Sequence, residues 1–86
     1  MAGRKSIPWP LQGERIFGPV SSRSRWVHDG DDINTIQEAV GVEPSGSYDE
    51  DTRRAVVKYQ QENDLPVTGT VDRKLWTRLT RGKGGE

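Results

Sequence analysis

The apolar positions in the centre of the chain recur at the three- and four-residue spacing of a helix. Over residues 32–40 the apolar side chains share one face, and Gly41 follows as a natural stop. This face consists of Ile33, Ile36, Ala39 and Val40. The pattern predicts a first helix from about Asp32 to Val40.

Two further helices follow from the same kind of pattern. Three carboxylates at residues 49–51 stand where the positive end of a helix dipole favours them, and Leu65-Pro66 ends the second helix. Asp72 opens a shorter third helix. The expected inward stripes are Ala55, Val56 and Tyr59 in the second helix, and Leu75, Trp76 and Leu79 in the third.

A short internal repeat precedes the second and third helices. Gly46-Ser47-Tyr48-Asp49 recurs 23 residues later as Gly69-Thr70-Val71-Asp72: glycine, small polar, apolar, aspartate. Each copy predicts a tight turn at glycine, one extended residue facing the core, and an aspartate that caps a helix. We also expect the two junctions to pair as a minimal strand contact between Ser47-Tyr48 and Thr70-Val71.

Residues 1–30 show no helical pattern. The two prolines of Ile7-Pro8-Trp9-Pro10-Leu11 fix an extended backbone, and its apolar side chains are costly to leave in water. We expect an all-α fold: a three-helix bundle with short Gly-x-φ-Asp turn junctions and an irregular N-terminal arm. Residues 1–30 form the arm packed on the core, 31–81 the helical module and 82–86 a disordered tail.

Composition limits what such a domain can do. Of 86 residues, 30% are apolar and 30% charged, which allows one modest core and argues against a large catalytic cavity. The absence of cysteine excludes disulfides, thiolate metal sites and cysteine nucleophiles. The only histidine is His28, so no convincing catalytic or zinc-binding set exists. We therefore expect no enzyme activity, no cofactor and no metal.

Charge and hydropathy argue against two classes of partner. Residues 31–65 carry nine acidic and three basic groups, whereas 1–30 and 66–86 each carry five basic and two acidic groups. This division gives no continuous basic stripe for nucleic acid. No stretch approaches the roughly 20 apolar residues that cross a bilayer, and the N-terminus lacks the apolar run of a signal peptide.

The central motifs resemble the peptidoglycan-binding domain family. Its pattern is an Ile/Leu-Gln helix, a Gly-x-aromatic turn, a Thr-x-x-Ala-Val-x-x-aromatic-Gln helix, a Leu-x-x-x-Gly-x-Val turn and a Trp/Leu helix. Here these elements stand, in order, as Ile36-Gln37, Gly46-Ser47-Tyr48, Thr52 to Gln60, Leu65 to Val71, and Leu75-Trp76 to Leu79. The resemblance implies non-catalytic, non-covalent binding of peptidoglycan by a cell-wall targeting module.

The upstream segment is similar to the lead-in of this module in lytic proteins of phages that infect actinobacteria. The matching residues are Pro8-Trp9-Pro10-Leu11, Ile16-Phe17-Gly18 and His28-Asp29-Gly30. The resemblance implies a module that targets a phage lytic or virion protein to the wall, alongside a catalytic domain or virion protein. We expect a monomer that acts at the bacterial cell wall, delivered by lysis, a partner chain or a virion.

Six residues are candidates for ligand contact. Trp26 offers an aromatic face to a glycan ring, and the amides of Gln37, Gln60 and Asn63 can bond a glycan or a peptide. The full set is Trp26, His28, Gln37, Tyr48, Gln60 and Asn63. Two structural alternatives stay open: His28 as a loop hydrogen-bonding residue, and Gln60 as a tie between the second helix and a turn.

Two rival functions also remain. A virion structural or assembly protein could use the same fold to bind protein, and a helical nucleic-acid binder is the second possibility. The fold alone does not separate a wall-binding module from a protein-binding one, since one scaffold hosts several functions.

Overall fold

The computed structural model describes residues 5–13, 15–19 and 26–81. Within these residues the chain is mostly helical, with three helices and one pair of short strands. The elements in order are β1 (Ile16–Phe17), β2 (Trp26–Val27), α1 (Asp31–Val40), α2 (Glu50–Glu62) and α3 (Arg73–Leu79).

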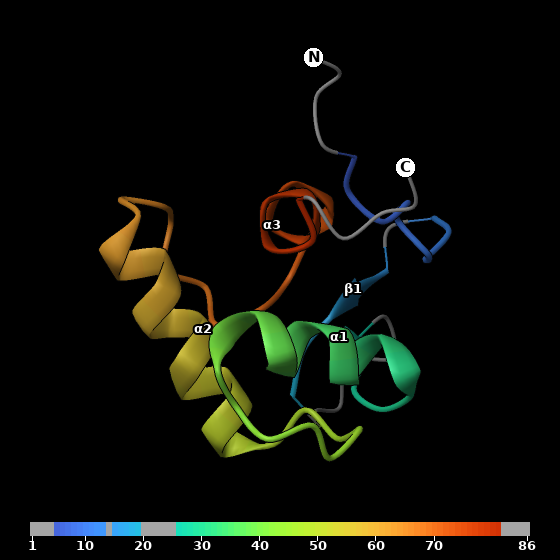
Figure 1. The fold of residues 1–86 in the computed structure, drawn as a ribbon, viewed down its shortest axis with the longest axis horizontal. Coiled ribbons are helices and arrows are strands. Elements are labelled where there is room, and N and C mark those ends of the chain that lie inside the picture. The colour runs from blue at the N-terminus through green and yellow to red at the C-terminus, as the bar shows by residue number, and fades with distance from the viewer. Residues whose placement is uncertain (1–4, 14, 20–25, 82–86) are drawn as a thin grey trace.

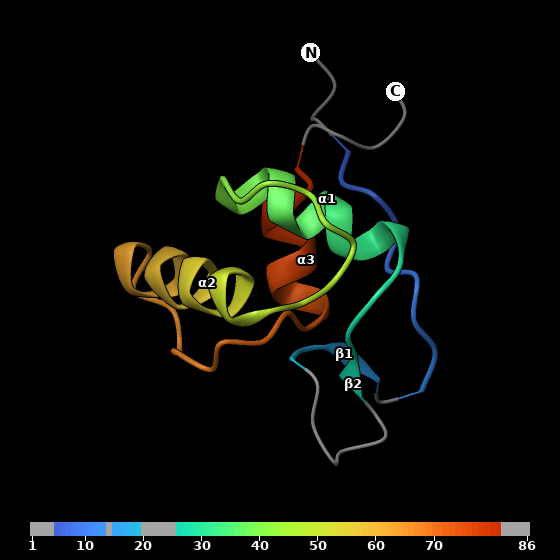
Figure 2. The ribbon, with the colours of Figure 1, turned by 90° about the horizontal axis from the view of Figure 1, so that it is seen from below.

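Helix α1 packs against both α2 and α3. In Figure 1 α3 is seen nearly end-on, with α2 to one side and β1 to the other, and α1 crosses below. The turned view of Figure 2 places the strand pair apart from α2, on the far side of α3. The helices thus bury their apolar stripes against one another, with the N-terminal segment along the open side of α3.

One core holds these elements together. It consists of Phe17, Ile33, Ile36, Tyr48, Val56, Val71, Leu75, Trp76 and Leu79. Trp76 is the largest of the fully buried side chains, and its ring stacks on that of Phe17 at a centroid distance of 5.3 Å. The predicted inward positions of α1 and α3 are accordingly buried, except that Ala39 and Val40 pack at the edge of the core.

The strand pair corrects the all-α prediction for the N-terminal segment. β1 and β2 pair in parallel, with Ile16 opposite Trp26 and Phe17 opposite Val27. Hydropathy could not predict this pair, because two-residue strands are too short to show an alternating pattern.

The two glycine turns are built alike, and each is tied by a glutamine from the preceding helix. Gln37 Oε1 accepts from the backbone N–H groups of Ser45 and Gly46, and its Nε2 donates to Ser47 O at 2.9 Å. The equivalent residue 23 positions later is Gln60, which accepts from the N–H groups of Thr68 and Gly69 and donates to Thr70 O. The internal repeat therefore includes a helix and its glutamine as well as the turn.

The expected strand contact between the two junctions is wrong. Ser47 instead bridges antiparallel to Asp29, and Val71 bridges antiparallel to Phe17. Each junction finds its backbone partner in the segment before α1: Tyr48 N donates to His28 O at 2.8 Å. The N-terminal segment supplies these backbone partners, and the two turns form no backbone hydrogen bond with each other.

Side-chain caps begin α2 and α3. Asp49 accepts from Thr52 N and Asp72 accepts from Leu75 N, both at the third helical position. The N–H of Thr52 lowers the pKa of Asp49, because the bond favours its charged form. The cap of α1 is Gly30, with no side-chain hydrogen bond.

The described part of the N-terminal arm is hydrogen-bonded to α3. Ile7 N donates to Thr80 Oγ1 at 3.0 Å, and the indole of Trp76 donates to Ile7 O at 2.8 Å. Trp9 meets the rings of Phe17 and Trp76 edge-on. The arm therefore contacts Trp76 through both apolar and polar groups. The predicted tail at 82–86 lies outside the described residues.

Candidate functional site

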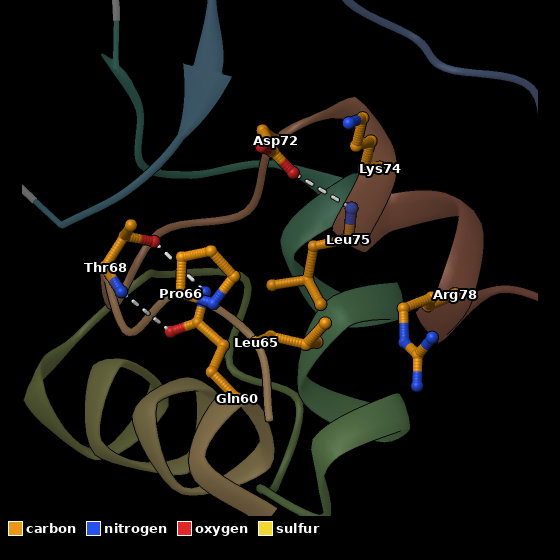
Figure 3. A pocket seen from close by; sticks show the side chains of 8 residues that line it. All are labelled: Gln60, Leu65, Pro66, Thr68, Asp72, Lys74, Leu75 and Arg78. Atoms are coloured by element: carbon orange, nitrogen blue, oxygen red, sulfur yellow. Dashed lines mark hydrogen bonds between the residues drawn. The ribbon is translucent and has the colours of Figure 1, made fainter. Parts of the chain in front are cut away.

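A pocket of about 360 Å³ opens where the loop after α2 faces α3. We refer to it as the loop pocket. Figure 3 shows its wall of loop residues on one side and α3 on the other. Its lining consists of Gln60, Leu65, Pro66, Thr68, Asp72, Lys74, Leu75 and Arg78.

The base of the loop pocket is apolar and held in place. Leu75 belongs to the core and Leu65 packs against it, and the exposed Pro66 lines the pocket beside them. Leu65 N donates to Gln60 O at 2.9 Å, which closes the end of α2 and fixes where the loop begins. The pocket is therefore shaped by the backbone of the second glutamine turn.

Two cations stand on the α3 side of the loop pocket. Lys74 and Arg78 are exposed and one helical turn apart, so they share a face of the helix. Arg78 Nη2 donates to Asn63 Oδ1 at 3.2 Å, and Asn63 is itself anchored to Tyr59 O. The carboxylate of Asp72 is engaged in capping α3, so the open groups of the rim are cationic.

Gln37 and Tyr48, two of the predicted ligand residues, are structural. Gln37 is fully buried, and both atoms of its amide are bonded within the turn and to Thr52. The Tyr48 hydroxyl donates to Gly69 O at 2.8 Å, and burial raises its pKa, so it remains a protonated donor. Neither side chain presents a polar atom to a ligand.

Gln60 ties α2 to a turn, which was the structural alternative for this residue. Its side-chain atoms are occupied by residues 68–70, and only 4% of the residue is exposed. It lines the loop pocket, but its amide oxygen and nitrogen are both already bonded to the turn. Asn63, at the end of α2, reaches the same pocket indirectly through Arg78.

Neither Trp26 nor His28 lines the loop pocket, and of the two only His28 is bonded to the first glutamine turn, where its backbone oxygen accepts from Tyr48 N. Trp26 is in β2, and the backbone of Gly18 approaches so closely that a Cβ there would lie 2.9 Å from the ring. The His28 side chain is 42% exposed, with Nδ1 3.9 Å from a carboxylate oxygen of Asp29. The six predicted residues therefore do not come together in one site.

Leu65, Lys74 and Arg78 line the loop pocket but were not among the residues predicted from the sequence. The i, i+4 spacing of Lys74 and Arg78 on the side of α3 away from Trp76 was the available signal. The position of the loop relative to α3 was not visible, because it depends on contacts between residues far apart in sequence.

One family model matches the helical part of the chain. The model of the family described as "Putative peptidoglycan binding domain" matches residues 32–79, more than half of the chain. The chain belongs to this family. No curated protein and no solved structure matches it.

The family match places the loop pocket inside the peptidoglycan binding domain. All of its lining residues, Gln60 to Arg78, fall within 32–79, whereas the arm and the strand pair precede the match. Membership supports peptidoglycan binding and action at the cell wall. In the described residues, no group of three or more His, Asp or Glu could hold a metal ion, and no helix is long and apolar enough to span a membrane.

Proposed function

We propose that this domain binds peptidoglycan non-covalently through the loop pocket, without catalysing a reaction. The observation that carries this proposal is the combination of an apolar base, Leu65 and Leu75, with an exposed cationic rim, Lys74 and Arg78. The family match supports peptidoglycan as the ligand, and the loop pocket is a concave surface with open charged groups inside the matched residues.

The chemistry of the rim favours the peptide stem over the glycan strand. Stem peptides carry small apolar side chains together with free carboxylates, and carboxylates are matched by lysine and arginine. The Asn63 contact holds the Arg78 guanidinium near the pocket, which lowers the entropy lost on binding. Asn63 is thus a positioning residue in this proposal, and Gln60 maintains the shape of the loop.

The wider setting belongs to the same proposal. We infer a module that targets a phage lytic or virion protein to the cell wall, supported by the similarity of residues 8–30 to the lead-in of such proteins. The isolated chain should then bind sacculi without releasing reducing sugar or free amino groups. The alternative, a virion assembly protein that binds protein through this fold, predicts no retention on sacculi.

The test of the pocket is co-sedimentation with purified sacculi. The double variant Lys74→Gln/Arg78→Gln removes both rim cations at exposed positions, so the fold should persist. If each cation contributes about 1 kcal/mol, the affinity should fall at least tenfold. A matched control is Lys58→Gln, which removes one exposed cation on α2, away from the loop pocket.

Three outcomes are distinguishable. Loss of binding in the double variant with retention in the Lys58 control supports the pocket. Equal binding by all three proteins places the ligand elsewhere, and absence of wild-type binding rejects the function itself. Thermal melting of each variant shows whether the fold has survived.

A further inference from the structure

A second pocket lies between the N-terminal arm and α3. Its volume is about 400 Å³, and we refer to it as the arm pocket. Its lining includes Trp9, Arg15, Ile16, Asp72, Arg73 and Lys74. Half of these residues precede the family match, so the pocket exists only because the arm is packed on α3.

Three exposed cations surround the arm pocket without a partner. Neither Arg15, Arg73 nor Lys74 has an ion pair for its charged group within the described residues. Among the described lining residues Asp72 is the one carboxylate, and its side chain accepts from Leu75 N. The described lining residues thus carry three positive charges and one negative charge, a net charge of about +2 that an anionic ligand would neutralise.

Trp9 adds an aromatic surface and an open donor. Its ring lies edge-on to Phe17 and Trp76, which fixes its orientation. The indole N–H has no hydrogen-bond partner among the described residues, and it is not among the buried unpaired atoms, so solvent reaches it. An indole offers an apolar surface to a sugar ring and a donor to one of its oxygens.

We propose that the arm pocket is a second binding site and that its ligand is an anionic sugar, a saccharide carrying a phosphate or a carboxylate. The two arginines supply planar donor pairs that suit either oxyanion, while Trp9 contacts the ring. A free inorganic anion would leave the Trp9 surface unused, and a neutral sugar would leave the three cations unneutralised.

The two pockets adjoin, since both are lined by Asp72 and Lys74. One extended wall polymer could occupy both, with a stem peptide in the loop pocket and an anionic sugar in the arm pocket. That the anionic sugar belongs to the cell wall rests on the proposed function. The binding of such a sugar by the arm pocket does not.

The test uses soluble probes and NMR, so it does not depend on retention by sacculi. Glucose 1-phosphate, glucuronate and neutral glucose are titrated at constant ionic strength into the full ¹⁵N-labelled chain. The signals to follow are the Trp9 indole N–H and the backbone amides of Gly13 and Arg73, all at the pocket. The variant Arg15→Gln/Arg73→Gln is compared with Arg54→Gln/Lys58→Gln, which removes two exposed cations from α2.

We expect saturable shifts of these signals with at least one anionic probe. Compared with the wild-type chain, affinity should fall at least tenfold in the Arg15/Arg73 variant but not in the Arg54/Lys58 variant. If glucose 1-phosphate alone gives a response, the ligand is a phosphate-bearing sugar. If glucuronate alone gives a response, the ligand is a sugar acid. Shifts no larger than those from neutral glucose overturn the proposal. Equal binding by the two variants overturns it as well.

Discussion

Single glutamines determine the two turns that organise this domain. Gln37 and Gln60 each accept from two consecutive backbone N–H groups and donate to a carbonyl oxygen of the same turn. Buried backbone groups require such partners, because each unsatisfied group costs about 1–3 kcal/mol. The glutamine amide can do both at once, because its oxygen accepts and its nitrogen donates.

Replacing Gln60 by leucine should therefore destabilise the domain by about 2–3 kcal/mol. The buried N–H of Gly69 would lose its acceptor, and residues 68–70 would lose their anchor on α2. Urea denaturation measures the change. The neighbouring Gln61 is exposed, so Gln61→Leu should change stability by less than about 0.5 kcal/mol. Similar losses in the two variants would contradict the assignment.

The glycines of the turns differ in what surrounds them. Gly69 has φ 74°, and a Cβ there would lie 3.1 Å from Arg53 Cγ, whereas Gly41 has φ 84° with nothing within 4 Å. Both alanine variants bear the left-handed backbone cost of about 1–2 kcal/mol. Gly69→Ala should cost more, because Arg53 must also move. If Gly69→Ala and Gly41→Ala have equal midpoints of thermal unfolding, moving Arg53 costs no free energy and the expectation is wrong.

At the scale of elements, the arm and α3 depend on each other. Thr80 Oγ1 accepts from Ile7 N and donates to Trp76 O, and the Trp76 indole donates to Ile7 O. This short network closes the arm over the largest residue of the core. The arm pocket lies between the segment held in this way and α3.

Thr80→Val should test the connection with little change in shape. It leaves Ile7 N without its acceptor, so we expect a loss of about 1–2 kcal/mol and faster hydrogen exchange at Ile7. Thr77→Val is the matched control, because Thr77 is exposed and its hydroxyl bonds only within α3. If hydrogen exchange at Ile7 is equally slow in both variants, Thr80 does not hold the arm.

The helices were predictable from sequence and the strand contacts were not. The apolar spacing in α1, α2 and α3 and the caps at Asp49 and Asp72 are local signals, and they predicted all three helices, although α2 ends at Glu62, before the predicted stop at Leu65-Pro66. The partners of the two turns depend on contacts across the chain, such as Val71 with Phe17. The same limit explains the site, where Gln37 and Tyr48 were predicted as ligand residues but fill the interior.

In the whole molecule, basic residues that are far apart in the sequence lie near one another. The sequence divides into basic flanks and an acidic centre. The described structure brings Arg15 from the first flank to Arg73, Lys74 and Arg78 of the last, around the two adjoining pockets. The cations thus gather where α3 meets the arm and the loop, which is the surface we assign to the cell wall.

The most direct measurement of this assignment is co-sedimentation of the wild-type chain with two preparations of sacculi. One retains its stem peptides, and the other has had them removed by an amidase. Binding through the loop pocket predicts strong retention on the stem-bearing sacculi and a loss of at least tenfold on the stripped ones. Equal retention on both would contradict recognition of the stem, and retention on neither would contradict peptidoglycan binding.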